Sequence, residues 1–186
     1  MQRAVVLDAC VLYPAALRDI LLRCAEAQFF TPIWSQRILA EMLAALSRHR
    51  PDIPKERLLR LQDLMSAAFP EACVDVDPLP LLLPDQDDSH VVAAAVACHA
   101  SVIVTLNIRH FPQSTVDVHT RALVMTPDQF LLQLVDEDPD AMANVVRRAA
   151  SALKNPPLSS TELLGAVALH APDYCAHVAS LLETDL

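Results

Sequence analysis

Glycine is nearly absent from this 186-residue chain, which contains only Gly165. Loops that cradle phosphate groups, such as the P-loop and the dinucleotide-binding loop, need several glycines so that the backbone can approach the phosphate. The chain has no loop of this kind, which excludes the classes of enzyme that depend on one. Turns are left to fourteen prolines, several of which stand where a helix would begin.

Long apolar runs and paired cysteines are missing as well. The longest apolar run, residues 91–98, is well short of the ~20 residues that a membrane-spanning helix needs. Asp8 interrupts the one apolar stretch near the N-terminus that could form the core of a secretory signal, so we expect none. Five scattered cysteines without C-x-x-C spacing favour reduced thiols and a cytoplasmic location over disulfides or a zinc site.

Positive charge is scarce, since the formal net charge is −9. Residues 1–125 carry −3 of it and residues 126–186 carry −6. This acidity argues against a protein that coats nucleic acid through many Lys and Arg side chains. It does not exclude a nuclease in which bound metal offsets the charge locally. At 53% hydrophobic residues, the chain can bury a substantial core and is not disordered.

Short apolar segments alternate with helical patterns along residues 1–126. Buried strands are predicted at 4–8, 101–105 and 122–125, and residues 73–77 alternate like a further strand. Predicted helices begin at Pro14, after Ser35, near Pro54 and after the Asp-rich turn 85–88. In the helix from Pro14, the apolar positions at helical spacing are Leu17, Ile20, Leu21 and Cys24. In the helix near Pro54 they are Leu58, Leu61, Leu64 and Met65. Buried strands separated by helices predict an α/β domain with a parallel sheet.

Residues 127–186 are predicted to form a helical C-terminal extension. Thr126 with Gln129, and Ser159 with Glu162, have the spacing of capping boxes. Asp138-Pro139 is expected to start a helix between them, and Pro172 a last, short one. Residues 155–157 (Asn-Pro-Pro) suggest a hinge.

Acidic residues stand at the ends of elements that are otherwise apolar. Asp8 follows residues 4–7, Asp88 precedes the run 91–98, and Glu41 lies within the apolar segment 38–43. Asn107 follows the strand predicted at 101–105. Open parallel sheets place their sites at the carboxyl ends of strands, where Asp8 and Asn107 fall. Gathered carboxylates repel each other unless a cation compensates, and oxygen ligands favour Mg²⁺ or Mn²⁺.

Each of these residues also has a simpler interpretation. Asp8 can bond the turn that follows its strand, and Asp87 or Asp88 can cap the next helix. Glu41 can form an exposed ion pair with Arg37 four residues earlier, and Asn107 can be a turn former. The seven histidines show no metal-binding spacing, so we expect surface or capping roles for them.

Four segments together resemble the PIN-domain nucleases, and within them the toxin-like (VapC-like) branch of bacterial type II toxin–antitoxin pairs. They are residues 5–14 (VVLDACVLYP), 34–41 (WSxxILxE), 84–95 (PDxDDxHVVAAA) and 104–112 (VTxNxxHFP). The resemblance implies a three-layer α/β/α sandwich with a central parallel sheet. It also implies a Mg²⁺- or Mn²⁺-dependent endoribonuclease that cuts RNA, often forms a homodimer and is inhibited by an antitoxin protein.

Carried over by position, Asp8, Glu41 and Asp88 would hold the metal, and Asn107 would align the attacking water. Asn107 adds no negative charge, and His110 stands where relatives often carry an acid. Cys10 replaces a small polar residue.

Two other functions stay open. One is a PIN scaffold that binds RNA or a protein without cleaving it, which Asn107 and His110 suggest. The other is a phosphatase with Asp8 as nucleophile, although such enzymes need a second acid two residues later, where this chain has Cys10. Arg18, Arg37 and Arg109 are candidates for phosphate contacts or for receiving an acidic antitoxin segment.

Overall fold

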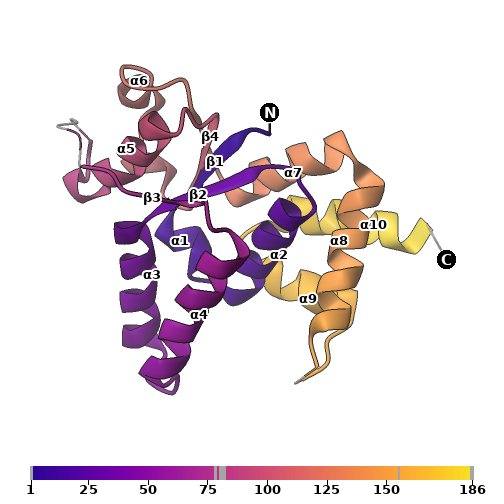
Figure 1. The fold of residues 1–186 in the computed structure, drawn as a ribbon. Helices are drawn as coiled ribbons and strands as arrows, with labels where there is room; N and C mark the ends of the chain where they lie inside the picture. Colours follow the sequence, from indigo (N-terminus) through magenta and orange to yellow (C-terminus); the bar gives the residue numbers. More distant parts are fainter. Residues whose placement is uncertain (1, 78, 80–82, 155, 185–186) are drawn as a thin grey trace.

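A five-stranded parallel sheet organises the N-terminal part of the chain (Figure 1). The computed structural model describes residues 2–77, 79, 83–154 and 156–184. The strands lie in the order β3-β2-β1-β4-β5. Their bounds are β1 Ala4–Leu7, β2 Thr31–Ser35, β3 Cys73–Val74, β4 Val102–Val104 and β5 Leu123–Met125. The parallel α/β sheet predicted from the sequence is therefore confirmed.

Strand β2 is the element that the sequence pattern did not predict. Pro32 obscures it, because proline cannot donate a hydrogen bond and is rare within sheets. Pro32 pairs with Val5 of β1, but its nitrogen faces the β3 side, as that of Trp34 does. Pairing with β3 begins only at Trp34, whose N–H donates to Ala72 O. The absence of an N–H at Pro32 therefore costs the sheet no hydrogen bond.

Helices cover both faces of the sheet. The bounds are α1 Ala9–Leu12, α2 Ala15–Glu26, α3 Gln36–His49, α4 Lys55–Ala68, α5 Ser89–Ala97, α6 Gln113–Val116, α7 Pro127–Glu137, α8 Pro139–Ala152, α9 Ser160–Val167 and α10 Pro172–Thr184, with short 3₁₀ helices η1 Gln86–Asp88 and η2 Ile108–His110. Helix α5 packs on β1, β2 and β4, whereas α2 packs on β2. They lie on opposite sides of the sheet in Figure 1, which gives the expected three layers.

The predicted start and buried stripe of α2 are confirmed, and so is the cap of α3. Leu17, Ile20, Leu21 and Cys24 of α2 are fully buried. Ser35 Oγ accepts a hydrogen bond from Ile38 N at 3.2 Å at the start of α3.

The apolar stripe expected for α4 is wider than the face that the structure buries. Leu58 and Met65 are buried, but Leu64 is 58% exposed. Helix α4 rests mainly on α3, so a narrower face is covered.

The C-terminal extension is helical and packs against α2. Both predicted capping boxes form, at Thr126 and Ser159. Helices α8 and α9 contact α2, and the rings of Phe30 and Phe130 meet edge to face at 5.0 Å. The buried apolar residues of the extension thereby continue the core of the sheet domain.

Of two further expectations for the extension, one is wrong and the other falls partly outside the described residues. The helix from Pro172 is not short, since α10 spans 13 residues. Asn155 of the predicted hinge lies outside the described residues, and its neighbours Lys154 and Pro157 form an isolated antiparallel bridge. Within the described ranges, no helix is long and apolar enough to cross a membrane.

Candidate functional site

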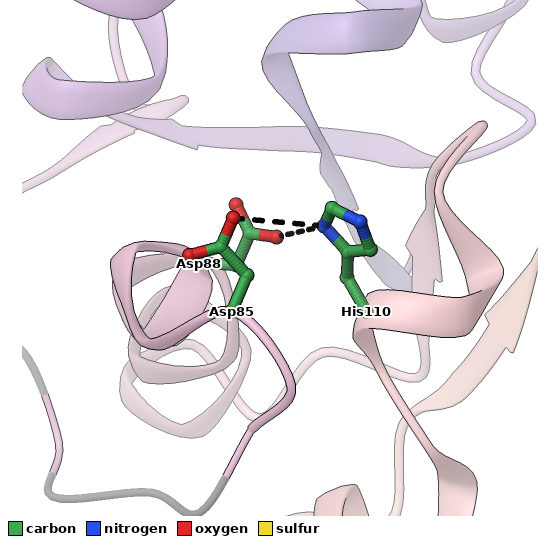
Figure 2. A group of neighbouring side chains, drawn as sticks. All are labelled: Asp85, Asp88 and His110. Carbon is green, nitrogen blue, oxygen red and sulfur yellow. Dashed lines mark hydrogen bonds and ion pairs between the residues drawn. The ribbon is translucent and has the colours of Figure 1, made fainter.

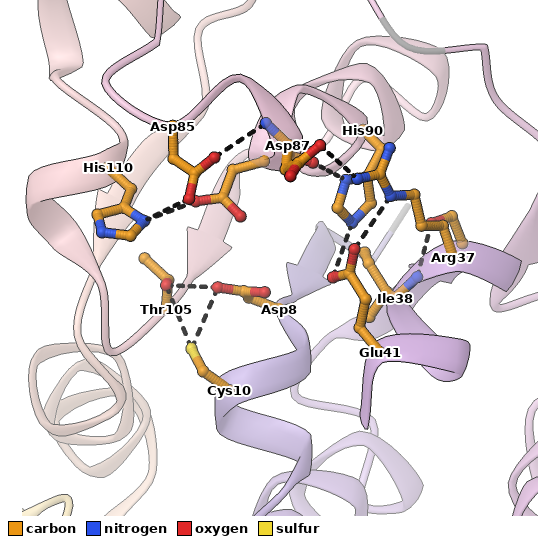
Figure 3. Close-up of polar contacts among 12 residues, drawn as sticks. Asp8, Cys10, Arg37, Ile38, Glu41, Asp85, Asp87, His90, Thr105 and His110 are labelled. Carbon is orange, nitrogen blue, oxygen red and sulfur yellow. Dashed lines mark hydrogen bonds and ion pairs between the residues drawn. The ribbon is translucent and has the colours of Figure 1, made fainter. Parts of the chain in front are cut away.

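Asp8 lies where strands β1 and β4 end side by side. Its N–H donates to Val104 O at 3.1 Å, and the residue is buried, with 5% of its surface exposed. The carboxylate accepts hydrogen bonds from Thr105 Oγ1 at 2.6 Å and Cys10 Sγ at 3.1 Å (Figure 3). It accepts no bond from the backbone of α1, but the Cys10 thiol of that helix donates to it, so the bond to the following turn considered from the sequence is present through a side chain. A buried carboxylate held by side-chain donors from α1 and from the end of β4 is positioned for a site.

Asp88 belongs to a group that also contains Asp85 and His110 (Figure 2). One ligand atom from each of the three lies within 4.8 Å of the others, which is a spacing that a metal ion can bridge. His110 Nδ1 lies 2.7 Å from Asp88 Oδ2 and 4.0 Å from Asp85 Oδ2. The helix-capping role considered for Asp87 or Asp88 falls instead to Asp85, whose Oδ1 accepts from Asp87 N at 3.0 Å.

Negative charge is in excess around Asp88. Burial raises the pKa of Asp88, and the nearby charges of Asp8 and Asp85 raise it further. The hydrogen bond and charge of His110 act in the opposite direction but do not outweigh these effects. A bound cation would oppose these effects and favour the ionised form of Asp88.

Glu41 lies in a second group of polar side chains, in which more of the negative charge has a basic partner than around Asp88. Its Oε1 is 3.0 Å from Arg37 Nε, and Arg37 Nη2 is 3.3 Å from Asp87 Oδ1. The Arg37–Glu41 ion pair considered from the sequence is therefore present (Figure 3). Burial by itself raises the pKa of Glu41, but His90 and Arg37 lower it by more, so that the net shift is downward. The ionised form of Glu41 is thus favoured by partners already in place, Arg37 and His90.

His90 connects Glu41 to the start of α5. The side chain is buried, so the expected surface role is wrong for this histidine. Nδ1 lies 2.7 Å from Asp87 O and carries the proton, because a carbonyl oxygen can only accept. Nε2 lies 3.3 Å from Glu41 Oε2 without hydrogen-bond alignment.

Asn107 is exposed just beyond β4. Its N–H donates to Thr105 Oγ1 at 3.0 Å, so that Thr105 connects Asn107 with Asp8. Asn107 and Glu41 also line one cavity of about 380 Å³. Metal ligation by Asp8, Glu41 and Asp88 and a role for Asn107 in aligning water remain predictions.

The structure adds three residues to this region that the predicted site omitted: Asp85, Thr105 and His90. Asp85 and His90 lie in the segment 84–95 that carries the resemblance, and Thr105 follows the last buried position of a predicted strand. Nothing in sequence spacing distinguishes them from capping residues, because their contacts join elements far apart along the chain.

Two of the three candidate arginines have other partners. Arg18 Nη1 donates to Leu12 O at 2.6 Å and Tyr13 O at 3.3 Å, and so closes the end of α1. Arg37 is engaged with Glu41 and Asp87. Arg109 is exposed on η2.

Sequence comparisons agree with this geometry. A PIN-domain family model matches residues 4–109, and a model described as the VapC50 C-terminal domain matches residues 127–176. A Mycobacterium tuberculosis protein named "Putative ribonuclease VapC50" is 35% identical over 97 residues, which are 52% of this chain and 57% of that protein. The chain thus matches little more than half the length of this relative. Since the first match covers more than half of the chain, the chain belongs to the PIN-domain family.

Proposed function

We propose that the protein is a Mg²⁺- or Mn²⁺-dependent endoribonuclease and the toxin of a toxin–antitoxin pair. The observation that carries the proposal is the cluster of Asp85, Asp88 and His110, whose ligand atoms lie within 4.8 Å of one another beside the carboxylate of Asp8 (Figure 3). A cluster of this kind, at the carboxyl ends of parallel strands, is suited to a divalent cation. The name of the M. tuberculosis relative describes a ribonuclease, which supports RNA as the substrate.

Asp8, Glu41 and Asp88 would hold the metal. Asp85 and His110 lie next to Asp88 and are further candidates. A bound divalent ion supplies activation of water and stabilisation of the leaving oxygen in phosphodiester hydrolysis. The donor set fits this ion, because it is rich in carboxylate oxygens and contains one imidazole.

The neighbouring residues orient these acids. Thr105 Oγ1 and Cys10 Sγ donate to the same oxygen of Asp8, Oδ2, which leaves Oδ1 for a cation. His110 Nδ1 engages Oδ2 of Asp88 and likewise leaves the other oxygen available. Asn107, beyond β4, would orient the phosphate or the attacking water through its amide.

The partners follow from the same proposal. Residues 1–126 would form the nuclease domain and residues 127–186 an extension to it. An antitoxin protein would inhibit the enzyme, and the enzyme would act as a homodimer. A gene for a short DNA-binding protein immediately upstream would support the toxin assignment, and co-purification of its product with this chain would test it.

RNA cleavage by the full chain tests the nuclease activity. Purified protein is incubated with RNA in Mg²⁺, in Mn²⁺ or with EDTA, beside Asp8→Ala and Asp88→Ala. Asp63→Ala is a matched control, since Asp63 is an exposed acid on α4. We expect metal-dependent cleavage by wild type and by the control, and none by the two site variants.

Two outcomes would contradict the proposal. Cleavage that persists in both site variants would exclude the acid cluster as the catalytic site. Absence of cleavage by folded wild type with either metal would favour a scaffold that binds RNA or a protein without cutting.

A further inference from the structure

A cavity of about 380 Å³ opens next to the acid cluster. Cys10, Glu41 and Asn107 line it, and all three also belong to the region of the proposed active site. Cys10 Sγ donates to Asp8 at 3.1 Å, so the cavity wall touches the carboxylate that would hold metal. A group bound in this cavity therefore lies directly beside the place where a phosphodiester would be cut.

The rest of the wall is formed by rings and apolar side chains. Tyr13, His49, Leu106 and His170 contribute to it. The rings of Tyr13 and His49 meet at 88° with their centroids 5.9 Å apart. Leu106 is 37% exposed, so part of its apolar side chain is accessible at the cavity wall. The surface thus offers apolar contact, with a phenol, two imidazoles and an amide for hydrogen bonds.

We infer that this cavity is a subsite for one unpaired nucleobase of the RNA substrate, adjacent to the scissile phosphate. The inference rests on the proposed function and names how that site recognises its substrate. A nucleobase has apolar faces that stack on aromatic side chains and polar edges that accept or donate hydrogen bonds. A phosphate fits poorly, because the wall is largely apolar and its one charged side chain, Glu41, is negative.

The subsite requires a single-stranded substrate. A base within a duplex is stacked and paired, so that it must leave the helix before it can enter a cavity. The cavity is preformed on one side, because Arg18 bonds the carbonyls of Leu12 and Tyr13 and fixes the end of α1. Loops and single-stranded regions are therefore the RNA segments that would fit.

His170 gives the C-terminal extension a part in recognition. It lies between α9 and α10, and its N–H donates to Val167 O at 2.9 Å. The next residue, Ala171, is fully buried, which anchors this junction in the helical core. The nuclease part of the chain thus supplies most of the cavity, and the extension supplies one imidazole of its wall.

RNA binding without cleavage tests the inference. All proteins are full-length and carry Asp8→Asn, and fluorescence anisotropy with EDTA measures their binding of a short single-stranded RNA. Tyr13→Ala should weaken binding by roughly 5- to 150-fold, the effect of losing one base–aromatic contact. His170→Ala should weaken it by about 3- to 10-fold, the effect of losing one hydrogen bond.

Control proteins separate loss of the subsite from loss of the fold. Tyr13→Phe keeps the ring and should bind within about twofold of the parent, because stacking does not need the hydroxyl. His177→Ala removes an exposed histidine of α10 and should bind as the parent does. An abasic nucleotide, moved along the RNA, should weaken parent binding at one position and have no effect on Tyr13→Ala there.

Several results would overturn the inference. They are equal binding by parent, Tyr13→Ala and His170→Ala; equal affinity for intact and abasic RNA; and no measurable RNA binding by the parent. The first is also expected if the cavity accepts a peptide segment instead.

Failure of the nuclease proposal would look different from these results. Wild type would then cut no RNA with either metal, while base-dependent binding through Tyr13 and His170 persisted with EDTA. Conversely, metal-dependent cleavage with unchanged binding in both variants would leave the nuclease intact and remove only the subsite.

Discussion

Two groups of acids around the proposed site differ in how their charge is balanced. In the Asp88 group (Asp8, Asp85, Asp88 and His110), one imidazole faces three carboxylates. In the Glu41 group (Arg37, Glu41, Asp87 and His90), a guanidinium and an imidazole face two. Burial is the main cause of the raised pKa of Asp88, and the charges of Asp8 and Asp85 add to it, whereas His90 and Arg37 outweigh burial and lower the pKa of Glu41.

The difference favours the Asp88 group as the place for a cation. Both acids contact a histidine, so the presence of a partner does not distinguish them. Burial opposes ionisation in both, but only around Asp88 do neighbouring carboxylates add to it. The Glu41 group already has the charge partners of an ion-pair cluster, whereas in the Asp88 group a bound cation would favour the ionised form of Asp88.

The largest effect is expected for Asp88→Asn. Cleavage should fall by at least about a hundredfold, beyond the 10–100-fold typical for residues that only support a metal ligand. Mn²⁺ should no longer raise the melting temperature, because the ligand is gone. The metal-free variant should melt above metal-free wild type, since one crowded charge is removed. Single-turnover cleavage and thermal unfolding with and without MnCl₂ measure these effects; an unchanged rate would contradict the comparison.

A smaller loss is expected for Glu41→Gln. Cleavage should fall by about 10- to 100-fold, because the remaining Asp88 group still attracts the cation. The stabilisation by Mn²⁺ should decrease but remain measurable. The same cleavage assay, run with Asp88→Asn in parallel, gives the ratio of the two losses. If Glu41→Gln were as inactive as Asp88→Asn, the two groups would contribute equally and the distinction between them would be wrong.

Adding an acid to the Asp88 group should tighten metal binding. The substitution His110→Asp replaces the imidazole by a fourth carboxylate, and divalent affinity should rise by about tenfold, or ~1.4 kcal/mol. Without metal, the variant should be less stable than wild type, since the hydrogen bond to Asp88 is lost and repulsion grows. Calorimetric titration with MnCl₂ measures the affinity. His177→Asp on α10 is the control, and an equal gain there would indicate only an effect of net charge.

The smallest effect is expected when the Glu41 group loses its guanidinium. Arg37→Gln leaves Glu41 and Asp87 without this partner, so Mn²⁺ affinity should rise by about two- to fivefold. Stability should change by less than ~1 kcal/mol, because the Arg37 ion pairs are exposed. Arg48→Gln, on the same helix, controls for the change in net charge. A Mn²⁺ affinity that falls in Arg37→Gln would mean that Arg37 positions Glu41 rather than neutralises it.

Much of the fold could be predicted because its signals are local. The buried stripe of α2 and the capping boxes at Thr126 and Ser159 depend on residues three or four positions apart. The failures have a common cause in tertiary context. Pro32 is tolerated in β2 only because its neighbour β3 is short, and Leu64 stays exposed because only part of α4 is covered.

The sequence by itself determined where β1 and β4 end, the polar residues Asp8 and Asn107 that follow them, and the scarcity of positive charge near the acids. Only the tertiary structure decided which acids share which partners. Helix α3 packs on α5 and so joins Glu41 to His90, while η2 brings His110 to Asp88. The extension likewise adds His170 to a cavity whose other lining residues stand more than sixty positions earlier in the chain. Such contacts depend on how side chains pack between elements far apart in sequence, which local patterns do not encode.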